Sequence, residues 1–267
     1  MNVHLLRRSD GDLAIYSRAQ LYDIAFSFRD YRREVDVMLN WYKRATGAMP
    51  RSILELAAGP ARHALEFARR GMSATALDLS PAMVRYARGL ARKQRRKLRV
   101  VRGDMRAFKL GRRFDLALLM MASDQHLLTQ RDLVRHLRCV GRHLTPGGVF
   151  IVESAYPEKP GEKARVQTHW KQKRGGLTVG FSWGGPGDPR DARRKVRSVT
   201  ITVTLGSGKK IRRFVGTTRQ REWTLPDFRK ALRKAASFEL VNTYGVFEPD
   251  APLDEKAWRM IRVLRRA

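Results

Sequence analysis

Two aspartates, Asp78 and Asp104, each follow a short strand-like run, and a turn of small residues lies upstream of both. The turn comprises residues 57–61 and follows an apolar run at residues 52–56, which contains Glu55. Small side chains let a bound molecule approach the backbone closely, and a carboxylate at the end of the next strand can accept hydrogen bonds from ribose hydroxyls. This spacing predicts a βαβ unit that binds a nucleoside.

The small-residue turn also indicates which kind of nucleoside would bind. It reads Ala-Ala-Gly-Pro-Ala, with Gly59 as its single glycine. A dinucleotide site uses a G-x-G-x-x-G helix start to hold a pyrophosphate, and that pattern is absent from this turn. The turn therefore favours S-adenosylmethionine over a dinucleotide.

Strands and helices alternate regularly through the middle of the chain. A serine cap and a first-turn proline, Ser80 and Pro81, mark one helix start. Such alternation predicts an α/β fold with a doubly wound, mostly parallel sheet. The expected strands are residues 52–56, 73–77, 98–102, 114–120 and 149–154, and the expected helices are residues 62–70, 81–93 and 129–143.

The flanking regions follow a different pattern. Residues 17–44 show a helical period, and residues 177–218 contain three expected strands, at 177–183, 198–205 and 210–218, with a hairpin at 206–209. A helix at 225–236 and two antiparallel strands, 238–247 and 257–264, would complete the sheet. We therefore expect a helical cap (residues 1–50), a core (51–166 and 224–267) and a β insertion that serves as an acceptor lid (167–223).

Residues 55–64 read E-L-A-A-G-P-A-R-H-A. This run resembles the first motif of the class I S-adenosylmethionine-dependent methyltransferases, acid-L-A/G-C/A-G-T/P-G-R-H-A. The resemblance extends over roughly residues 20 to 265 and is closest to amino-sugar N-methyltransferases. It implies a Rossmann-like fold, S-adenosylmethionine as cofactor and S-adenosylhomocysteine as product. Ala57 and Ala61 replace two usual glycines, and because alanine disfavours positive φ, they bear on cofactor affinity.

The same resemblance implies roles for individual residues. Asp78 would bind the ribose, Asp104 would accept a hydrogen bond from the adenine amino group, and Tyr22 would close over the cofactor. The full set of implied cofactor-binding residues is Tyr22, Glu55, Ala57, Gly59, Ala61, Asp78, Leu79, Met83, Asp104, Met105 and Met121.

Acceptor-binding residues are expected after the fourth strand, because ligands in such sheets lie at the carboxyl ends of the strands. Residues 120–128 resemble an F-S-S-x-G-H-L stretch of amino-sugar N-methyltransferases, which aligns Ser123 and His126. His126 is the candidate general base, since its ordinary pKa lies near neutral pH; packing against the following helix explains it equally well. Arg221 is a further substrate-side candidate. We expect no metal site.

The formal charge of +30 leaves an alternative open. We expect a small-molecule N- or O-methyltransferase, but the charge also suits an RNA- or ribosome-directed methyltransferase, or a weakened homologue that binds RNA or another polyanion. A non-enzymatic scaffold of the same fold is a third reading.

The single Cys139 fits a reducing compartment. We expect a cytoplasmic protein without a membrane span, and the basic start of the chain suits organellar targeting only weakly. The oligomeric state is open.

Overall fold

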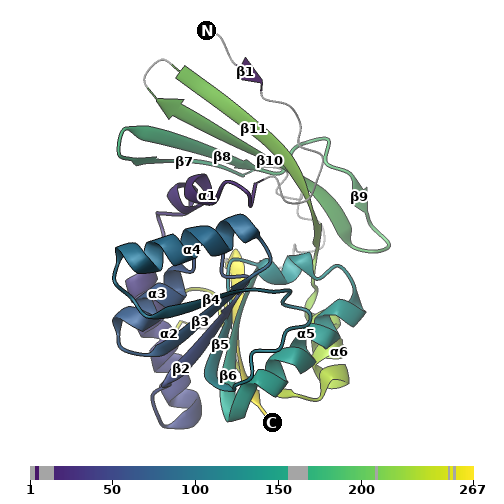
Figure 1. Ribbon diagram of the computed structural model, residues 1–267. Helices are drawn as coiled ribbons and strands as arrows, with labels where there is room; N and C mark the ends of the chain where they lie inside the picture. The colour runs from purple at the N-terminus through teal and green to yellow at the C-terminus, as the bar shows by residue number, and fades with distance from the viewer. Residues whose placement is uncertain (1–3, 6–14, 156–167, 208–209, 252, 255–256) are drawn as a thin grey trace. The chain divides into compact units, whose positions relative to one another are not determined.

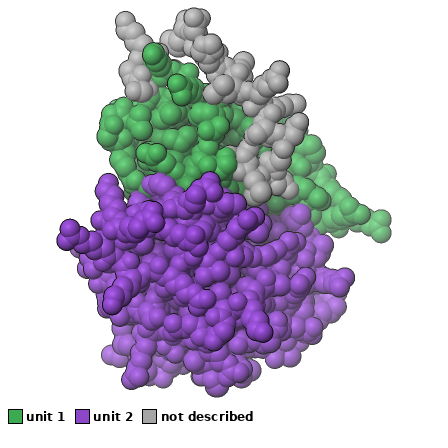
Figure 2. Space-filling view, in the orientation of Figure 1, with its two compact units in different colours: residues 1–30, 158–222 green, residues 31–157, 223–267 purple. Residues whose placement is uncertain are grey.

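The computed structural model describes residues 4–5, 15–155, 168–207, 210–251, 253–254 and 257–267. The chain forms two compact units, which are coloured separately in Figure 2. Unit 1 comprises residues 1–30 and 158–222, and unit 2 comprises residues 31–157 and 223–267. This division differs from the expected helical cap of residues 1–50, because residues 31–50 group with the core sheet.

The core of unit 2 is a seven-stranded sheet in the order β12-β13-β6-β5-β2-β3-β4. Strands β2 to β6 pair in parallel, whereas β13 runs antiparallel to both of its neighbours. The doubly wound, mostly parallel sheet predicted from the sequence is therefore present. The strands are β2 (Ser52–Leu56), β3 (Ser73–Asp78), β4 (Leu98–Arg102), β5 (Phe114–Leu119), β6 (Leu144–Ala155), β12 (Phe238–Tyr244) and β13 (Arg259–Arg266).

Helices cover both faces of this sheet (Figure 1). On one face lie α2 (Tyr31–Thr46), α3 (Arg62–Arg69) and α4 (Pro81–Lys93); on the other lie α5 (Gln130–His143) and α6 (Leu225–Ala235). Strand β2 is buried on both sides, as expected for a central parallel strand. Within the described residues, the helices are all too short or too polar to traverse a bilayer.

Unit 1 contains a second, smaller sheet in the order β1-β11-β10-β8-β7, with β9 paired to β10. Helix α1 (Ala19–Ala25) packs against β7 and β8. The predicted hairpin joins β10 and β11, although residues 208–209 of its turn lie outside the described residues. The strands are β1 (His4–Leu5), β7 (Thr168–Arg174), β8 (Leu177–Trp183), β9 (Arg190–Asp191), β10 (Val196–Ser207) and β11 (Lys210–Arg221).

One sequence prediction was wrong: residues 17–44 do not form a single helix. The helical residues divide into α1 and α2, with a non-helical segment at 26–30. The apolar residues keep a helical spacing on both sides of the break, because each of the two helices buries an apolar face of its own. The faces have different partners, since α1 contacts strands of unit 1 whereas α2 contacts α3 and β6 in unit 2. Asp30 immediately precedes α2, and aspartate favours helix starts.

Candidate functional site

Two loops leave the sheet of unit 2 where its strand order reverses. The chain passes from β2 outward to β3 and β4, and then returns to β5 on the other side of β2. Residues 57–61 follow β2, and residues 120–123 follow β5. Ligands of open α/β sheets bind outside the carboxyl ends of the strands at such a switch point. The two loops therefore define the candidate site.

Left-handed backbone conformations are concentrated in these two loops. In the first, φ is +48° at Ala57, +53° at Gly59 and +56° at Ala61; in the second, φ is +60° at Met121 and +52° at Ala122. Four of the seven positive-φ non-glycine residues in the described part of the chain lie here. Such residues cost roughly 1–3 kcal/mol each and cluster at functional sites. Ala57 and Ala61 thus adopt the left-handed backbone conformation that glycine favours.

Asp78, at the end of β3, ties the first loop to the sheet. Its Oδ2 accepts a hydrogen bond from the Gly59 N–H at 2.7 Å, and its Oδ1 accepts one from the Ser80 N–H at 2.8 Å. Burial raises the pKa of Asp78, and the charge of Glu55 raises it further, while the two N–H groups oppose this. Each carboxylate oxygen has two lone pairs, so Asp78 retains capacity to accept hydrogen bonds from ribose hydroxyls.

Asp104 also lies beyond a strand end, but its carboxylate already has a cationic partner. Arg106 donates from Nε at 2.9 Å and from Nη2 at 2.6 Å to Oδ2, and its backbone N–H donates to Oδ1 at 2.8 Å. Burial alone would raise the pKa of Asp104, but the hydrogen bonds and charge of Arg106 outweigh this and lower it. An adenine amino group would share the Asp104 carboxylate with Arg106 or displace the Arg106 side chain.

The apolar residues expected beside the adenine differ in their exposure. Leu79 is 49% exposed, whereas Met83 is only 1% exposed and lies in the first turn of α4. Leu79 therefore offers apolar surface to a ligand, whereas Met83 belongs to the buried interior. Met105 is anchored through its carbonyl, which accepts a hydrogen bond from His136 Nδ1 at 2.8 Å.

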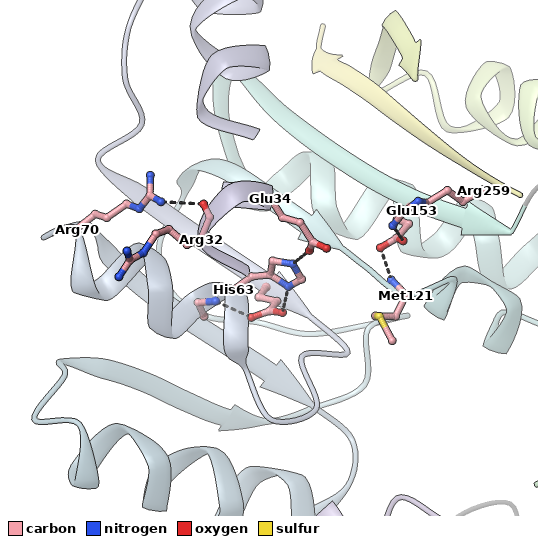
Figure 3. A network of polar contacts seen from close by, with 9 residues as sticks. Arg32, Glu34, His63, Arg70, Met121, Glu153 and Arg259 are labelled. Carbon is pink, nitrogen blue, oxygen red and sulfur yellow. Dashed lines mark hydrogen bonds and ion pairs between the residues drawn. The ribbon is translucent and has the colours of Figure 1, made fainter. Parts of the chain in front are cut away.

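Glu55 belongs to a buried charge network with His63 and Glu34 that the sequence does not reveal. His63 and Glu34 are labelled in Figure 3. Its Oε2 accepts from the Ala64 N–H at 2.8 Å, and its Oε1 lies 3.2 Å from His63 Nδ1. His63 Nε2 lies 2.7 Å from Glu34 Oε2. Burial alone would lower the pKa of His63, but the two carboxylates overcome this and raise it to about 9. His63 is thus an imidazolium between two glutamates, and Glu55 acts within the protein rather than as an open ligand group.

A second buried carboxylate, Glu153 of β6, holds the loop after β5. Its Oε2 accepts from the Met121 N–H at 2.9 Å, and its carbonyl accepts from the Ala122 N–H at 3.1 Å. Arg259 of β13 supplies the counter-charge, with Nη1 at 3.0 Å from Oε1 (Figure 3). Ser123 is also engaged, because its hydroxyl donates to the Met120 carbonyl at 2.7 Å. The left-handed residues of this loop are therefore fixed by neighbouring strands.

His126 is half-buried at the end of the 3-10 turn η1 (Ser123–His126). Asp124 in the same turn is buried and accepts a 2.5 Å hydrogen bond from the Ser154 hydroxyl, which itself accepts one from Arg262 at 2.8 Å. Burial raises the pKa of Asp124 to about 6. Nothing in the sequence signals this cluster, because its members come from distant elements.

Two of the predicted site residues, Tyr22 and Arg221, belong to unit 1. Tyr22 lies in α1, with its ring centroid 4.5 Å from that of Phe26 and 6.5 Å from that of Phe181. Arg221 is the last residue of β11. Within their own unit, Tyr22 is part of an aromatic cluster and Arg221 ends a strand, so their roles toward a ligand stay predictions.

Part of the chain is similar in sequence to known methyltransferases. Residues 53–148 match a family model described as a methyltransferase domain. The dTDP-3-amino-3,4,6-trideoxy-alpha-D-glucopyranose N,N-dimethyltransferase of Streptomyces venezuelae is 31% identical over 137 residues, which are 51% of this chain and 56% of the relative. The chain spans about half the length of the curated relatives it matches.

Solved structures show the same fold. An S-adenosylmethionine-dependent methyltransferase from Clostridium acetobutylicum superposes with a TM-score of 0.76 at 19% identity, over 92% of this chain and 96% of that one. An S-adenosylmethionine-bound amino pentose methyltransferase from Micromonospora echinaspora gives a TM-score of 0.73 at 22% identity, over 93% and 97%. The Rossmann-like fold that the resemblance at residues 55–64 implies is thereby confirmed.

Proposed function

We propose that this protein is an S-adenosylmethionine-dependent methyltransferase that acts on a nitrogen or oxygen of a small-molecule acceptor. One observation carries the proposal: Asp78 holds a small-residue, left-handed loop at the switch point of the sheet and keeps lone pairs for further hydrogen bonds. The curated relatives are named for amino-sugar substrates. We therefore favour an amine on a sugar-like acceptor.

The chain's own residues would bind and orient the reactants. S-adenosylmethionine, when bound, supplies a methyl group already activated by a sulfonium. Asp78 orients the ribose, Leu79 covers apolar ring surface and Asp104 accepts from an amino group. Because the methyl group is already activated, the protein's main task is to align donor with acceptor and to exclude water. His126 would hold a proton from the acceptor, and losing it would cost little if that amine is already neutral.

Calorimetric titration with S-adenosylhomocysteine tests the cofactor site. We expect the wild-type protein to bind and Asp78→Ala to weaken binding by at least about tenfold, the equivalent of one charge-assisted hydrogen bond. Asp115→Asn is the matched control. Asp115 Oδ2 likewise accepts hydrogen bonds from two backbone N–H groups, those of Arg51 and Ser52. These groups lie at the amino end of β2, away from the candidate site. Unchanged affinity in Asp78→Ala would refute the proposed site.

The acceptor class requires a separate assay. Incubation with S-adenosylmethionine and a panel of amino sugars, free and nucleotide-linked, should yield a product heavier by one methyl group in place of hydrogen. A salt-dependent gel shift with RNA tests the alternative acceptor, for which the +30 charge is the motive. RNA methylation without sugar methylation would replace the small-molecule proposal.

We propose that the protein acts in the cytoplasm, which the buried Cys139, a free thiol, supports.

A further inference from the structure

We propose that Glu34, a helix α2 residue outside the methyltransferase motif, is a positioning residue for the loop at residues 57–61, acting through His63 and Glu55. The inference rests on the proposed function, since its readout is binding of the cofactor product. It predicts that cofactor affinity depends on a side chain that need not touch the cofactor.

Helix α3 begins without a side-chain cap of its own. Its N-cap residue is Ala61, which has a left-handed backbone and no side chain that can accept a hydrogen bond. The N–H of Ala64, the third helical residue, is a group that an N-cap side chain usually satisfies. Here Glu55 of β2 accepts that hydrogen bond. Glu55 lies just before the loop and Ala64 just after it, so this bond closes the loop at its base.

Glu55 is held in place by a neighbouring cation. Its side chain is buried, and a buried carboxylate requires a compensating charge. His63 supplies that charge at 3.2 Å, and it lies within the same closed segment. The ring of Tyr31 meets the imidazole edge-on, with centroids 4.9 Å apart, which restricts the tilt of the ring. His63 therefore balances the charge of Glu55 only while both of its ring nitrogens are protonated.

Glu34 is the second carboxylate partner of His63. It pairs with His63 Nε2 at 2.7 Å, the shorter of the two contacts, and its side chain is only 9% exposed. The charged groups facing His63 are thus Glu34 from α2 and Glu55 from β2, and the Glu55 charge also reaches Asp78 on β3. If Glu34 loses its charge, His63 is protonated less readily. Glu55 then lacks a cation above neutral pH, and the loop loses its anchor.

The variant Glu34→Gln tests this chain of contacts, because glutamine keeps the shape of the side chain and removes its charge. We expect S-adenosylhomocysteine to bind Glu34→Gln and wild type within about twofold of each other near pH 6, where a histidine with one carboxylate partner stays protonated. Near pH 8.5, we expect the variant to bind about three- to tenfold more weakly, a loss comparable to a weakened charge-assisted hydrogen bond. Wild-type affinity should change little over this range.

Glu66→Gln is the matched control, because Glu66 is a half-buried α3 carboxylate that pairs with Arg69 and Arg70 instead of the loop network. The affinity of Glu66→Gln for S-adenosylhomocysteine should equal that of the wild type at both pH values. The same ratio of affinities for Glu34→Gln at both pH values would overturn the inference and leave the proposed function intact. Failure of the wild type to bind would instead remove the proposed function.

An NMR titration of the wild-type protein tests the inference independently of any variant. The His63 ring signals should remain those of an imidazolium through neutral pH. A His63 ring that loses its proton at the ordinary value near 6.5 would overturn the inference even if Glu34→Gln failed to fold.

Discussion

Ala57 and Ala61 stand where glycine would relieve backbone strain, and the two positions differ in what the methyl group contributes. A left-handed alanine costs about 1–2 kcal/mol. Ala57 is half-buried. Ala61, at the end of the loop, is fully buried, and its methyl group packs in the core. The balance between strain and packing should therefore differ between the two sites.

We expect Ala57→Gly to stabilise the protein by about 0.5 kcal/mol, because the relief of strain exceeds the extra entropy that glycine loses on folding. Ala61→Gly should be close to neutral, since it also removes a buried methyl group worth about 0.8 kcal/mol. Urea denaturation measures both. Ala58→Gly is the control: Ala58 is buried without positive φ, so its change should cost about 1 kcal/mol or more. Equal losses at Ala57 and Ala58 would contradict the argument.

The residues that could be identified from the sequence are those whose role depends on nearby sequence. Asp78 follows a strand and precedes a capped helix, so its position at the sheet edge can be predicted from spacing. The partners of His63 cannot be predicted in this way, because Glu34 is 29 residues away and meets His63 only once α2 packs on α3. The histidine within the motif was the one available signal, and spacing alone gives no indication of its charge.

At the scale of elements, two strands of the core sheet support the loop after β5. We expect Glu153→Ala to destabilise the folded protein by about 3 kcal/mol, the lower end of the range for buried ion pairs, because it leaves Arg259, whose side chain is 16% exposed, without its carboxylate partner. The double variant with Arg259→Ala should lose less than the sum of the single variants, as measured by a denaturation cycle.

The same strand β13 offers a control for this cycle. Arg265 pairs with Glu239 of β12, but both side chains are about half exposed, at 47% and 60%. Glu239→Ala should therefore change stability by less than about 1 kcal/mol. Additive effects of the Glu153 and Arg259 variants would show that the two side chains act separately.

Elements with local start and stop signals were predicted most accurately. Helix α4 begins at Pro81 behind a Ser80 cap and ends at Lys93, as the sequence indicates. The break between α1 and α2 was missed, because the apolar period continues across it. Strand β7 was missed as well: it reads THWKQKR, is mostly exposed, and is recognisable as a strand only through its pairing with β8. Tertiary partners decide both cases.

At the scale of the whole molecule, the titration of His63 should lower the free energy of unfolding as the pH becomes alkaline. Its pKa is raised to about 9 in the folded state, above the ordinary value of 6.5. Its contribution, up to about 3 kcal/mol, is therefore complete below pH 6.5 and is lost as pH rises through about 9. We expect the urea midpoint to fall between about pH 7 and pH 10.

Other strongly shifted groups act outside that window. The raised pKa of Asp124, about 6, lowers stability as pH rises from about 4 to 6, whereas the depressed pKa of His136, about 4, raises stability as pH increases over nearly the same range. Burial lowers the pKa of Arg262 to about 10, which affects stability only above that pH. Asp124→Asn should alter the acid side of the profile and leave the alkaline decline intact. A flat urea midpoint from pH 7 to pH 10 would rule out a charged His63.

The strand order has a consequence for synthesis on the ribosome. Strand β13 lies between β6 and β12, yet it is made after both. A nascent chain that has delivered β12 has no partner for it in the sheet, and the edge of β6 stays open until β13 emerges. Unpaired edges of this kind recruit other chains. The growing polypeptide is therefore most exposed to aggregation, and most in need of chaperones, during the last step that completes its sheet.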